Sequence, residues 1–304
     1  MQDKSINDIA STHLGSGGSY AVYTDKFDPS LLVAMPRYLA RQDWNITGKE
    51  FVGYDVWHCH EATFLTNNGL PIAGTLKIVY NAATELMVES KSMKLYLNSF
   101  DMCKMGDSIL EAIRKYEIQV KHDLETLLQD NVEVCFHANG NQERGKNSLL
   151  EYLNIYDLID DLQDLKFDDY QAKENHLNFQ FLEDYRQQVD VFTNVLRSRC
   201  RHTKQKDTGS AFLSIATNNG YFDLASVLRQ IVSLREQNEF HEFCAEKLFV
   251  DFMGHEKFVD SLMIALLYTR RGSLDINPIR ATSYDVIPPE LYTASIFTLK
   301  TEEQ

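Results

Sequence analysis

The chain has 304 residues, a formal net charge of −14 at pH 7 and a hydrophobic content of 44%, which together indicate an ordinary globular protein with room for two cores. No apolar run reaches the roughly 18 residues of a membrane span, so we do not expect a membrane protein. The acidic balance argues against broad binding to a nucleic-acid backbone, which requires a basic surface, but it allows a local basic pocket for a small phosphorylated ligand.

Cysteine usage and the N-terminus both favour a reducing compartment. The first residues, Met1–Ser5, lack the basic start and apolar run of a signal peptide. The cysteines are scattered, odd in number and without a CxxC pair, which argues against a disulfide framework. We therefore expect a cytoplasmic protein. The five cysteines are Cys59, Cys103, Cys135, Cys200 and Cys244.

The beginning of the chain predicts loop followed by a strand hairpin. Residues 1–50 look mostly like loop, with a flexible glycine-rich patch at 15–18. Strands are expected over 54–64 and 71–80, because Asn67-Asn68-Gly69 between them is a favourable hairpin turn.

Within the first of these strands, His58-Cys59-His60 suggests a set of metal ligands. Strand alternation would point Cys59 away from both histidines, and no matching ligand pair with familiar spacing is present. We therefore expect no metal site.

A third strand and a long helix follow in the first half. Apolar alternation places Met93, Leu95 and Leu97 on one face of a strand. Apolar residues at helical spacing then predict a helix over about 106–129. Beyond it lie a polar segment at 139–147, expected to be a loop, and an acidic stretch over 157–169, which we interpret as a solvated connection between the halves.

The second half repeats this order of elements. Both halves read as strand hairpin, helix and strand, which predicts a duplicated α+β unit with helices on one face of an antiparallel sheet. We place the two modules at 1–165 and 166–304. The elements expected in the second half are strands over 179–198, 211–217 and 262–268, a hairpin turn at 218–220, a helix that Asp223 caps, and a helix over 238–253.

Cys200 lies in one of the most basic stretches of this acidic chain. The segment 197–207 carries five Lys or Arg residues and one histidine, and nearby cations favour the nucleophilic thiolate. Asp207 follows seven residues later as a candidate proton carrier, before the turn-like Thr208-Gly209-Ser210. From charge alone the alternative is a non-catalytic cysteine in a solvated basic loop, since cysteine is more often buried filler than a catalyst.

Three other polar segments allow either a functional or a plain structural interpretation. Ser90–Lys94 reads as the solvent face of a strand or as a phosphate-binding group, and Arg270-Arg271 as a surface pair or an anion site. No GxGxxG motif follows a strand, so a Rossmann cofactor site is not expected. A third group of polar residues forms either an ordinary polar face of a helix or a substrate-binding group: Glu239, His241, Glu242 and Glu246.

Four ordered blocks closely resemble the NADPH-dependent 7-cyano-7-deazaguanine reductases, a family of nitrile reductases in queuosine biosynthesis, a tRNA-modification pathway. The order of the blocks and the chain length are similar to the long, two-module form of this family. Leu31-Leu32 with Pro36-Arg37 also looks like the N-terminal region of that form. The blocks are Glu89–Phe100, the Cys200–Asp207 loop, Asn238–Glu242 and Tyr268–Pro278.

The resemblance implies a tunnelling fold in each half, in which an antiparallel sheet is backed by two helices. Such units assemble side by side, and ligands bind at the seams. The implied protein is a homodimer that takes a small-molecule substrate and NADPH, without direct contact to nucleic acid or membrane.

The resemblance also implies roles for individual residues. Cys200 would add to the nitrile carbon and form a covalent thioimide, while Asp207 would pass the proton. Two NADPH would then convert the nitrile to a primary amine, giving 7-aminomethyl-7-deazaguanine. Glu242 suits the ring N–H and exocyclic amine of the substrate. The substrate-binding positions match Val88, Glu89, Ser90, His241 and Glu242, and the cofactor-binding positions match Ser90, Lys91, Arg271 and Gly272.

The nucleophile loop departs from the family pattern. After the nucleophile the family usually reads Gln-Pro-Asp and an aromatic residue, whereas this chain reads Gln205-Lys206-Asp207-Thr208, without the rigid proline and the aromatic platform. Arg201 and His202 replace residues that are usually apolar, and Ser273 replaces a glycine. Two other functions therefore stay open: an amidine-forming transferase that captures the thioimide with ammonia, and a non-catalytic binding or sensing protein.

Overall fold

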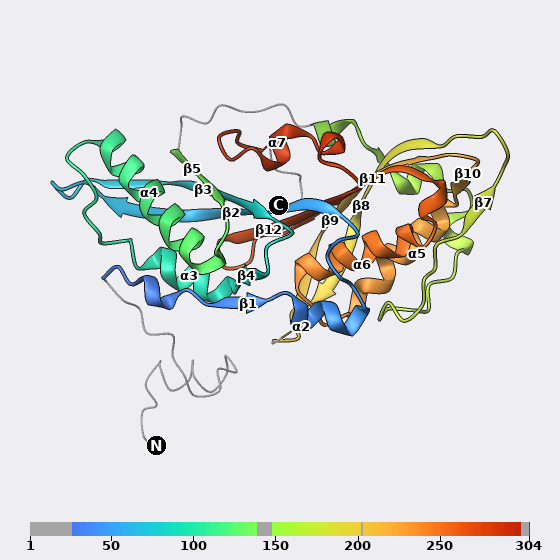
Figure 1. The fold of residues 1–304 in the computed structure, drawn as a ribbon, viewed down its shortest axis with the longest axis horizontal. Coiled ribbons are helices and arrows are strands. Elements are labelled where there is room, and N and C mark those ends of the chain that lie inside the picture. Colours follow the sequence, from blue (N-terminus) through green and yellow to red (C-terminus); the bar gives the residue numbers. More distant parts are fainter. Residues whose placement is uncertain (1–25, 139–147, 202, 299–303) are drawn as a thin grey trace, which may run out of the picture.

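The computed structural model describes residues 26–138, 148–201, 203–298 and 304. The protein is of mixed α+β class, with one long sheet and helices that run along it (Figure 1). The glycine-rich patch at 15–18, the expected loop at 139–147 and His202 lie outside the described residues. Among the described helices, none combines the length and the apolar character needed to cross a membrane.

The main sheet has eight strands in the order β5-β3-β2-β12-β11-β9-β8-β6. Two smaller pairs, β1 with β4 and β7 with β10, lie outside it. The strands are β1 (Ala34–Pro36), β2 (Val52–Leu65), β3 (Pro71–Asn81), β4 (Leu86–Val88), β5 (Val132–Ala138), β6 (Leu153–Asn154), β7 (Phe179–Phe181), β8 (Gln188–Arg199), β9 (Lys206–Thr217), β10 (Gly220–Phe222), β11 (Val259–Tyr268) and β12 (Leu274–Ala281). The α-helices are α2 (Tyr38–Arg41), α3 (Ser90–Asn98), α4 (Ile109–Leu128), α5 (Leu224–Ser233), α6 (His241–Met253) and α7 (Pro289–Tyr292).

Strand β12, which was not predicted from the sequence, joins elements from the two halves of the chain. It pairs antiparallel with β11 on one side and with β2 on the other. Through this strand the β2–β3 hairpin is continuous with β11, β9 and β8. Because the sheet is continuous, side chains from the beginning and the end of the chain meet beside its central strands.

Alternation along the strands divides the core into layers. Trp57 and Ile78 pack with residues of α3 and α4 in one cluster, while their neighbours Val56 and Val79 face the opposite side and pack against the segment around α7. A third cluster joins β8, β9 and β11 to α5 and α6. The fully buried Phe64 stacks on Tyr116 of α4, with ring centroids 4.4 Å apart.

The predicted strand over 92–98 is wrong, because these residues belong to helix α3. Glu89 caps the helix, since its carboxylate accepts a hydrogen bond from the Ser92 amide at 2.7 Å. The buried positions Met93, Tyr96, Leu97 and Phe100 follow helical spacing rather than alternation. The helix places Lys91 and Lys94 one turn apart on the same side.

Most other elements lie close to their predicted places. The β2–β3 hairpin and α4 agree with the prediction, and the Ser108 hydroxyl accepts from the Glu111 amide at the start of α4. Asp223 caps α5 as expected. The acidic stretch from residue 157 to 169 contains only 3-10 turns and coil, and most of its aspartates are exposed. Its apolar residues Ile159, Leu162 and Phe167 instead pack against the core cluster of the second half.

Three details of the second half differ from the expectation. The segment 179–198 holds two separate strands, β7 and β8. The turn at 218–220 does not close a hairpin on β9, because β10 pairs with β7 instead. Strand β9 begins at Lys206, so Asp207 lies in a strand and not in a loop.

The His58-Cys59-His60 segment of β2 follows strand alternation. Cys59 packs in the core cluster under α3 and α4. The two histidines instead meet Asp275 of β12, with Nδ1 of His58 2.8 Å from Oδ1 and Nε2 of His60 2.5 Å from Oδ2. Over the described ranges, no group of three or more His, Cys, Asp or Glu side chains has an arrangement suited to a metal ion.

Candidate active site

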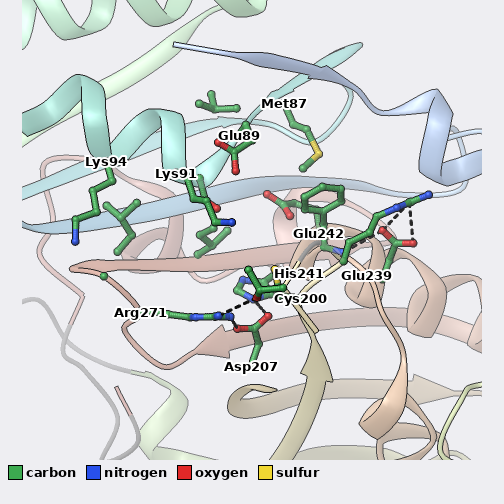
Figure 2. A pocket seen from close by; sticks show the side chains of 18 of the residues that line it. Met87, Glu89, Lys91, Lys94, Cys200, Asp207, Glu239, His241, Glu242 and Arg271 are labelled. Atoms are coloured by element: carbon green, nitrogen blue, oxygen red, sulfur yellow. Dashed lines mark hydrogen bonds and ion pairs between the residues drawn. The ribbon is translucent and has the colours of Figure 1, made fainter. Parts of the chain in front are cut away.

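A cavity of about 330 Å³ lies where α3, the end of β8, the start of α6 and the segment before β12 converge (Figure 2). Every site residue predicted from the sequence lines it: Val88, Glu89, Ser90, Lys91, Cys200, Asp207, His241, Glu242, Arg271 and Gly272. Side chains from both halves of the chain therefore share one space.

Helix α3 supplies one wall of the cavity. Val88 ends β4, Glu89 caps the helix, and Ser90 and Lys91 open its first turn. The Glu89 amide donates to the Val33 carbonyl oxygen at 2.9 Å, which fixes the entry to the helix. The first turn of α3 is held in place by these backbone contacts.

Lys94 also lines the cavity, although it was not predicted. Figure 2 shows Lys91 and Lys94 extending from α3 on the same side of the cavity. The strand predicted here hid this pairing, since a spacing of three residues places side chains on opposite faces of a strand but on one face of a helix. Recognition of Glu89 as a helix cap was the signal that would have revealed it.

The β8–β9 connection presents Cys200 beside Asp207. The Cys200 amide donates to the Gln205 carbonyl oxygen at 2.9 Å, and the Lys204 amide donates to the Cys200 carbonyl oxygen at 3.0 Å. Asp207 lies opposite Ser198 in the β8–β9 ladder. Ser198 in turn precedes Cys200 by two residues. Residues two apart share a face of a strand, so the ladder directs Cys200 and Asp207 toward the same side.

Asp207 is a buried carboxylate between Arg271 and His241. Its Oδ1 pairs with Nη1 of Arg271, and its Oδ2 lies 3.5 Å from Nε2 of His241. Burial alone would raise the pKa of Asp207, but the hydrogen bonds and charges of His241 and Arg271 outweigh it and hold the pKa below its ordinary value of 3.8. Asp207 is therefore ionised at neutral pH.

His241 is fixed by stacking as well as by its contact with Asp207. Its ring lies over the Tyr268 ring, with centroids 3.6 Å apart and an angle of 6° between the planes. His241 is the first residue of α6, so the helix and the strand β11 both orient it. The imidazole is held as one wall of the cavity.

Glu242 is almost fully buried at the cavity, with a relative exposure of 1%. Its Oε1 has no hydrogen-bond partner within the part of the chain that the structure describes. Burial and the nearby charge of Asp55 raise the pKa of Glu242 to about 8, with Arg37 acting in the opposite direction. A buried carboxyl group with an unfilled acceptor is suited to a ligand that brings N–H donors.

Arg271 contacts the Cys200–Asp207 segment in addition to lining the cavity. Besides Asp207, its guanidinium hydrogen-bonds the Gln205 side chain and, at 3.2 Å, the Thr203 hydroxyl. The next residue, Gly272, has φ of 61°, which glycine adopts easily, and a Cβ there would approach Nζ of Lys94 to 3.3 Å. Arg271, Gly272 and Lys94 thus form a close basic corner.

Arg201 and Glu239 also line the cavity and were not assigned to the site from the sequence. Nη1 of Arg201 lies 3.0 and 3.1 Å from the two Glu239 oxygens, and Nη2 lies 3.4 Å from Asp43. Arg201, which stands where the family usually has an apolar residue, is therefore paired with Glu239. This ion pair joins the loop beside Cys200 to the segment before α6.

Comparison with known proteins identifies the relatives of this chain. A family model described as "Nitrile reductase, 7-cyano-7-deazaguanine-reductase N-term" matches residues 23–136. Two curated proteins of Coxiella burnetii, from strains CbuK_Q154 and Dugway 5J108-111, are each named NADPH-dependent 7-cyano-7-deazaguanine reductase. Each is 33% identical over 273 residues, which cover 88% of this chain and 91% of the relative.

A solved structure titled "Crystal structure of the archaeosine synthase QueF-Like in the apo form" aligns with 33% of this chain and 96% of its own, at 14% identity and a TM-score of 0.29. That likeness is too small to define a fold. The matches along the sequence are sufficient in themselves, and they place the chain among the nitrile reductases, a class of oxidoreductases. More narrowly, it belongs to the family of NADPH-dependent 7-cyano-7-deazaguanine reductases.

Proposed function

We propose that this protein reduces the nitrile of 7-cyano-7-deazaguanine to 7-aminomethyl-7-deazaguanine, for queuosine biosynthesis, with NADPH as the reductant. The observation that carries the proposal is the common cavity, in which a cysteine, an ionised carboxylate and a buried acceptor carboxyl group face the same space. Family membership names the substrate and the cofactor, since both curated relatives carry this activity in their names.

Cys200 is the proposed nucleophile. Asp207 takes the thiol proton, the sulfur of Cys200 adds to the nitrile carbon, and the proton moves to the nitrile nitrogen to give a covalent thioimide. The depressed pKa of Asp207 supports its role as the acceptor of the thiol proton, because the carboxylate is already ionised when the substrate reaches Cys200. The Arg271 and His241 contacts keep the carboxylate in place during this transfer.

Glu242 is the proposed group that recognises the heterocycle. Its carboxylate accepts the ring N–H and the exocyclic amine of the deazaguanine edge, and the unfilled Oε1 supports this role. His241 borders the same space from the first turn of α6, and Val88, Glu89 and Ser90 border it from the other half of the chain. The site thus encloses the substrate between α3 and α6.

The basic corner of the cavity fits NADPH. Lys91, Lys94 and Arg271 bring cations and Ser90 a hydroxyl for its phosphate groups, and Gly272 leaves room where a side chain would crowd Lys94. NADPH bound at this corner would supply the hydrides that the reduction requires, one from each of two molecules. One nitrile, two NADPH and two protons give one amine and two NADP⁺, and the Cys200 thiol is regenerated.

The proposal extends to the architecture. We assign the chain to two tandem tunnelling-fold modules, 1–165 and 166–304, which supply α3 and Cys200 respectively. The antiparallel hairpins backed by α3 and α4 in one half, and by α5 and α6 in the other, support this division. A homodimer in the cytoplasm is the assembly that the family resemblance implies, and size-exclusion chromatography with light scattering measures it.

The function is tested by adding 7-cyano-7-deazaguanine to the purified protein with NADPH and identifying the product by mass. Loss of NADPH absorbance together with formation of the primary amine supports the reductase. An amidine formed from ammonia, without NADPH consumption, would instead assign the transferase. Tight binding of the nitrile without any product would assign a binding or sensing protein, for which the altered loop after Cys200 is the motivating observation.

A further inference from the structure

A buried ion network lies beside the cavity. Arg37 Nη2 contacts Asp55 Oδ2 at 2.5 Å, and Arg280 Nη1 contacts Asp55 Oδ1 at 2.8 Å. Arg280 Nη2 and Arg41 Nη2 both reach Glu246 Oε1, at 2.9 and 2.8 Å. All five residues have a relative exposure of 8% or less. Charges removed from water to this extent persist only when they are paired with one another.

The network ties α6 to elements from the other half of the chain. Arg37 precedes α2, Arg41 lies in α2 and Asp55 lies in β2, whereas Arg280 comes from β12. Glu246 of α6 is the residue on which the arginines converge. The network therefore fixes the position of the helix that carries Glu242.

Glu242 lies one helical turn before Glu246, so both carboxyl groups leave the same face of α6. Arg37, Arg41 and Arg280 bring three positive charges against the two negative charges of Asp55 and Glu246, which leaves an excess of one positive charge. An ionised Glu242 would balance that excess.

Two of the buried polar atoms that lack a hydrogen-bond partner among the described residues support this connection. Nη1 of Arg37 is buried and has no hydrogen-bond partner among the described residues, and it lies 4.0 Å from Glu246 Oε1. Oε1 of Glu242 is also buried, lines the cavity and lacks a hydrogen-bond partner in the same ranges. Glu246 links the two groups, since Arg37 Nη1 approaches it and Glu242 precedes it by one turn of α6.

We propose that Arg37 and Asp55 are positioning residues that set the protonation of Glu242 from opposite sides, Arg37 favouring the carboxylate and Asp55 favouring the neutral acid. The inference rests on the proposed function, in which Glu242 accepts two N–H donors of a purine-like edge. After burial itself, Asp55 is the strongest influence that raises the pKa of Glu242, and Arg37 is the leading influence that lowers it.

The other ionisable groups around Glu242 do not change the sign of this effect. Arg280 of β12 acts in the same direction as Arg37. Tyr80 of β3 is held neutral by burial, since its pKa lies far above the ordinary value. The remaining charged or titratable groups near this part of the cavity and network are Arg41, Glu89, Lys91, Glu239, His241 and Glu246.

The consequence is a coupling between substrate binding and proton release. A neutral Glu242 retains its own proton and offers fewer acceptor sites, whereas the carboxylate accepts both N–H donors. Below the pKa of Glu242, binding must therefore release a proton, and affinity falls as the pH falls. Removing Arg37 moves this loss to higher pH, and removing the charge of Asp55 moves it to lower pH.

The test is the affinity for 7-cyano-7-deazaguanine from pH 5.5 to 9, measured by calorimetry in a Cys200→Ala background so that no covalent adduct forms. We expect the loss of affinity at low pH to move up by about one unit in Arg37→Gln and down by about one unit in Asp55→Asn. Arg114→Gln is the matched control, because it removes an exposed cation of α4 that lies outside the network, and its profile should stay in place.

Opposite displacements in the two variants support the proposal, since a purely structural role would move both in the same direction. Equal displacements, or none, overturn it while leaving the reductase intact. If Arg37→Gln does not fold, the near-isosteric Asp55→Asn still shows whether the pH at which affinity is lost moves down or stays in place. Absence of any binding by the Cys200→Ala protein overturns the substrate assignment itself, and this inference falls with it.

Discussion

Arg271 should control the proton affinity of Asp207, and Arg271→Met tests this directly. Asp207 is buried and stays ionised because Arg271 and His241 oppose the cost of burial. The substitution removes one of the two partners and leaves the buried carboxyl group against His241 alone. The pKa of Asp207 should rise, and the thiol of Cys200 should lose its proton acceptor at a higher pH than in the unaltered protein.

The magnitude follows from the geometry. A cation in direct contact lowers the pKa of a carboxyl group by roughly 1–3 units. The Arg271 side chain is 39% exposed, so solvent screens its charge and the lower end of this range applies. We therefore expect a displacement of about one unit.

The sign of the displacement follows from the proposed role of Asp207 as a base. A carboxylate whose pKa is depressed in the folded protein stays ionised above that pKa and is protonated as the pH falls through it. Raising the pKa therefore moves the loss of proton acceptance to higher pH.

The assay is the rate of covalent adduct formation at Cys200 without NADPH, followed by mass spectrometry from pH 3 to 8. Omitting NADPH separates proton transfer from the proposed contact of Arg271 with the cofactor. Arg270→Met is the matched control, since Arg270 is the exposed neighbour in sequence. If the rate of adduct formation falls at the same pH in Arg271→Met and in Arg270→Met, the role of Arg271 is refuted.

Two further predictions concern packing and the cofactor corner. Phe64→Ala should cost about 3–5 kcal/mol in the free energy of unfolding, measured by urea titration, because the ring is fully buried against Tyr116; a loss below 1 kcal/mol would contradict the packing. Gly272→Ala should weaken NADPH binding in a fluorescence titration, because it strains a residue with φ of 61° and crowds Lys94. An unchanged affinity would remove Gly272 from the cofactor site.

Local patterns identified much of the fold. The β2–β3 hairpin, α4 and the cap of α5 are each determined by a few neighbouring residues, and they lie where the sequence predicts them. Helix α3 is different, because alternating apolar residues and helical spacing overlap in a segment as short as 92–98. The cap at Glu89, together with burial of Tyr96, decides in favour of the helix.

Other features depend on contacts between distant residues. Strand β12 is defined by its partners β2 and β11, and β2 lies more than 200 residues away in sequence. The placement of Asp207 in β9 follows from the ladder with β8, which local composition does not reveal. The ion network around Glu246 has the same origin, since Arg41 and Glu246 are separated by 205 residues.

The resemblance supplied the residues of the site, and the structure adds their electrostatics. From the sequence, Cys200 was singled out for its basic surroundings and Glu242 for its hydrogen-bonding pattern. The contacts of Asp207 with Arg271 and His241, and of Arg201 with Glu239, appear only when the chain is folded. These contacts stabilise a loop that lacks the family's usual proline.

The most direct test of the central claim is the stoichiometry of NADPH consumed per nitrile, measured for the unaltered protein and for Cys200→Ala. We expect the unaltered protein to consume two NADPH per molecule of 7-cyano-7-deazaguanine, and Cys200→Ala to consume none. Circular dichroism should show that the variant remains folded. Measurable reduction by folded Cys200→Ala would contradict the covalent mechanism. No consumption by the unaltered protein, even where a covalent adduct forms at Cys200, would contradict the assignment as a reductase.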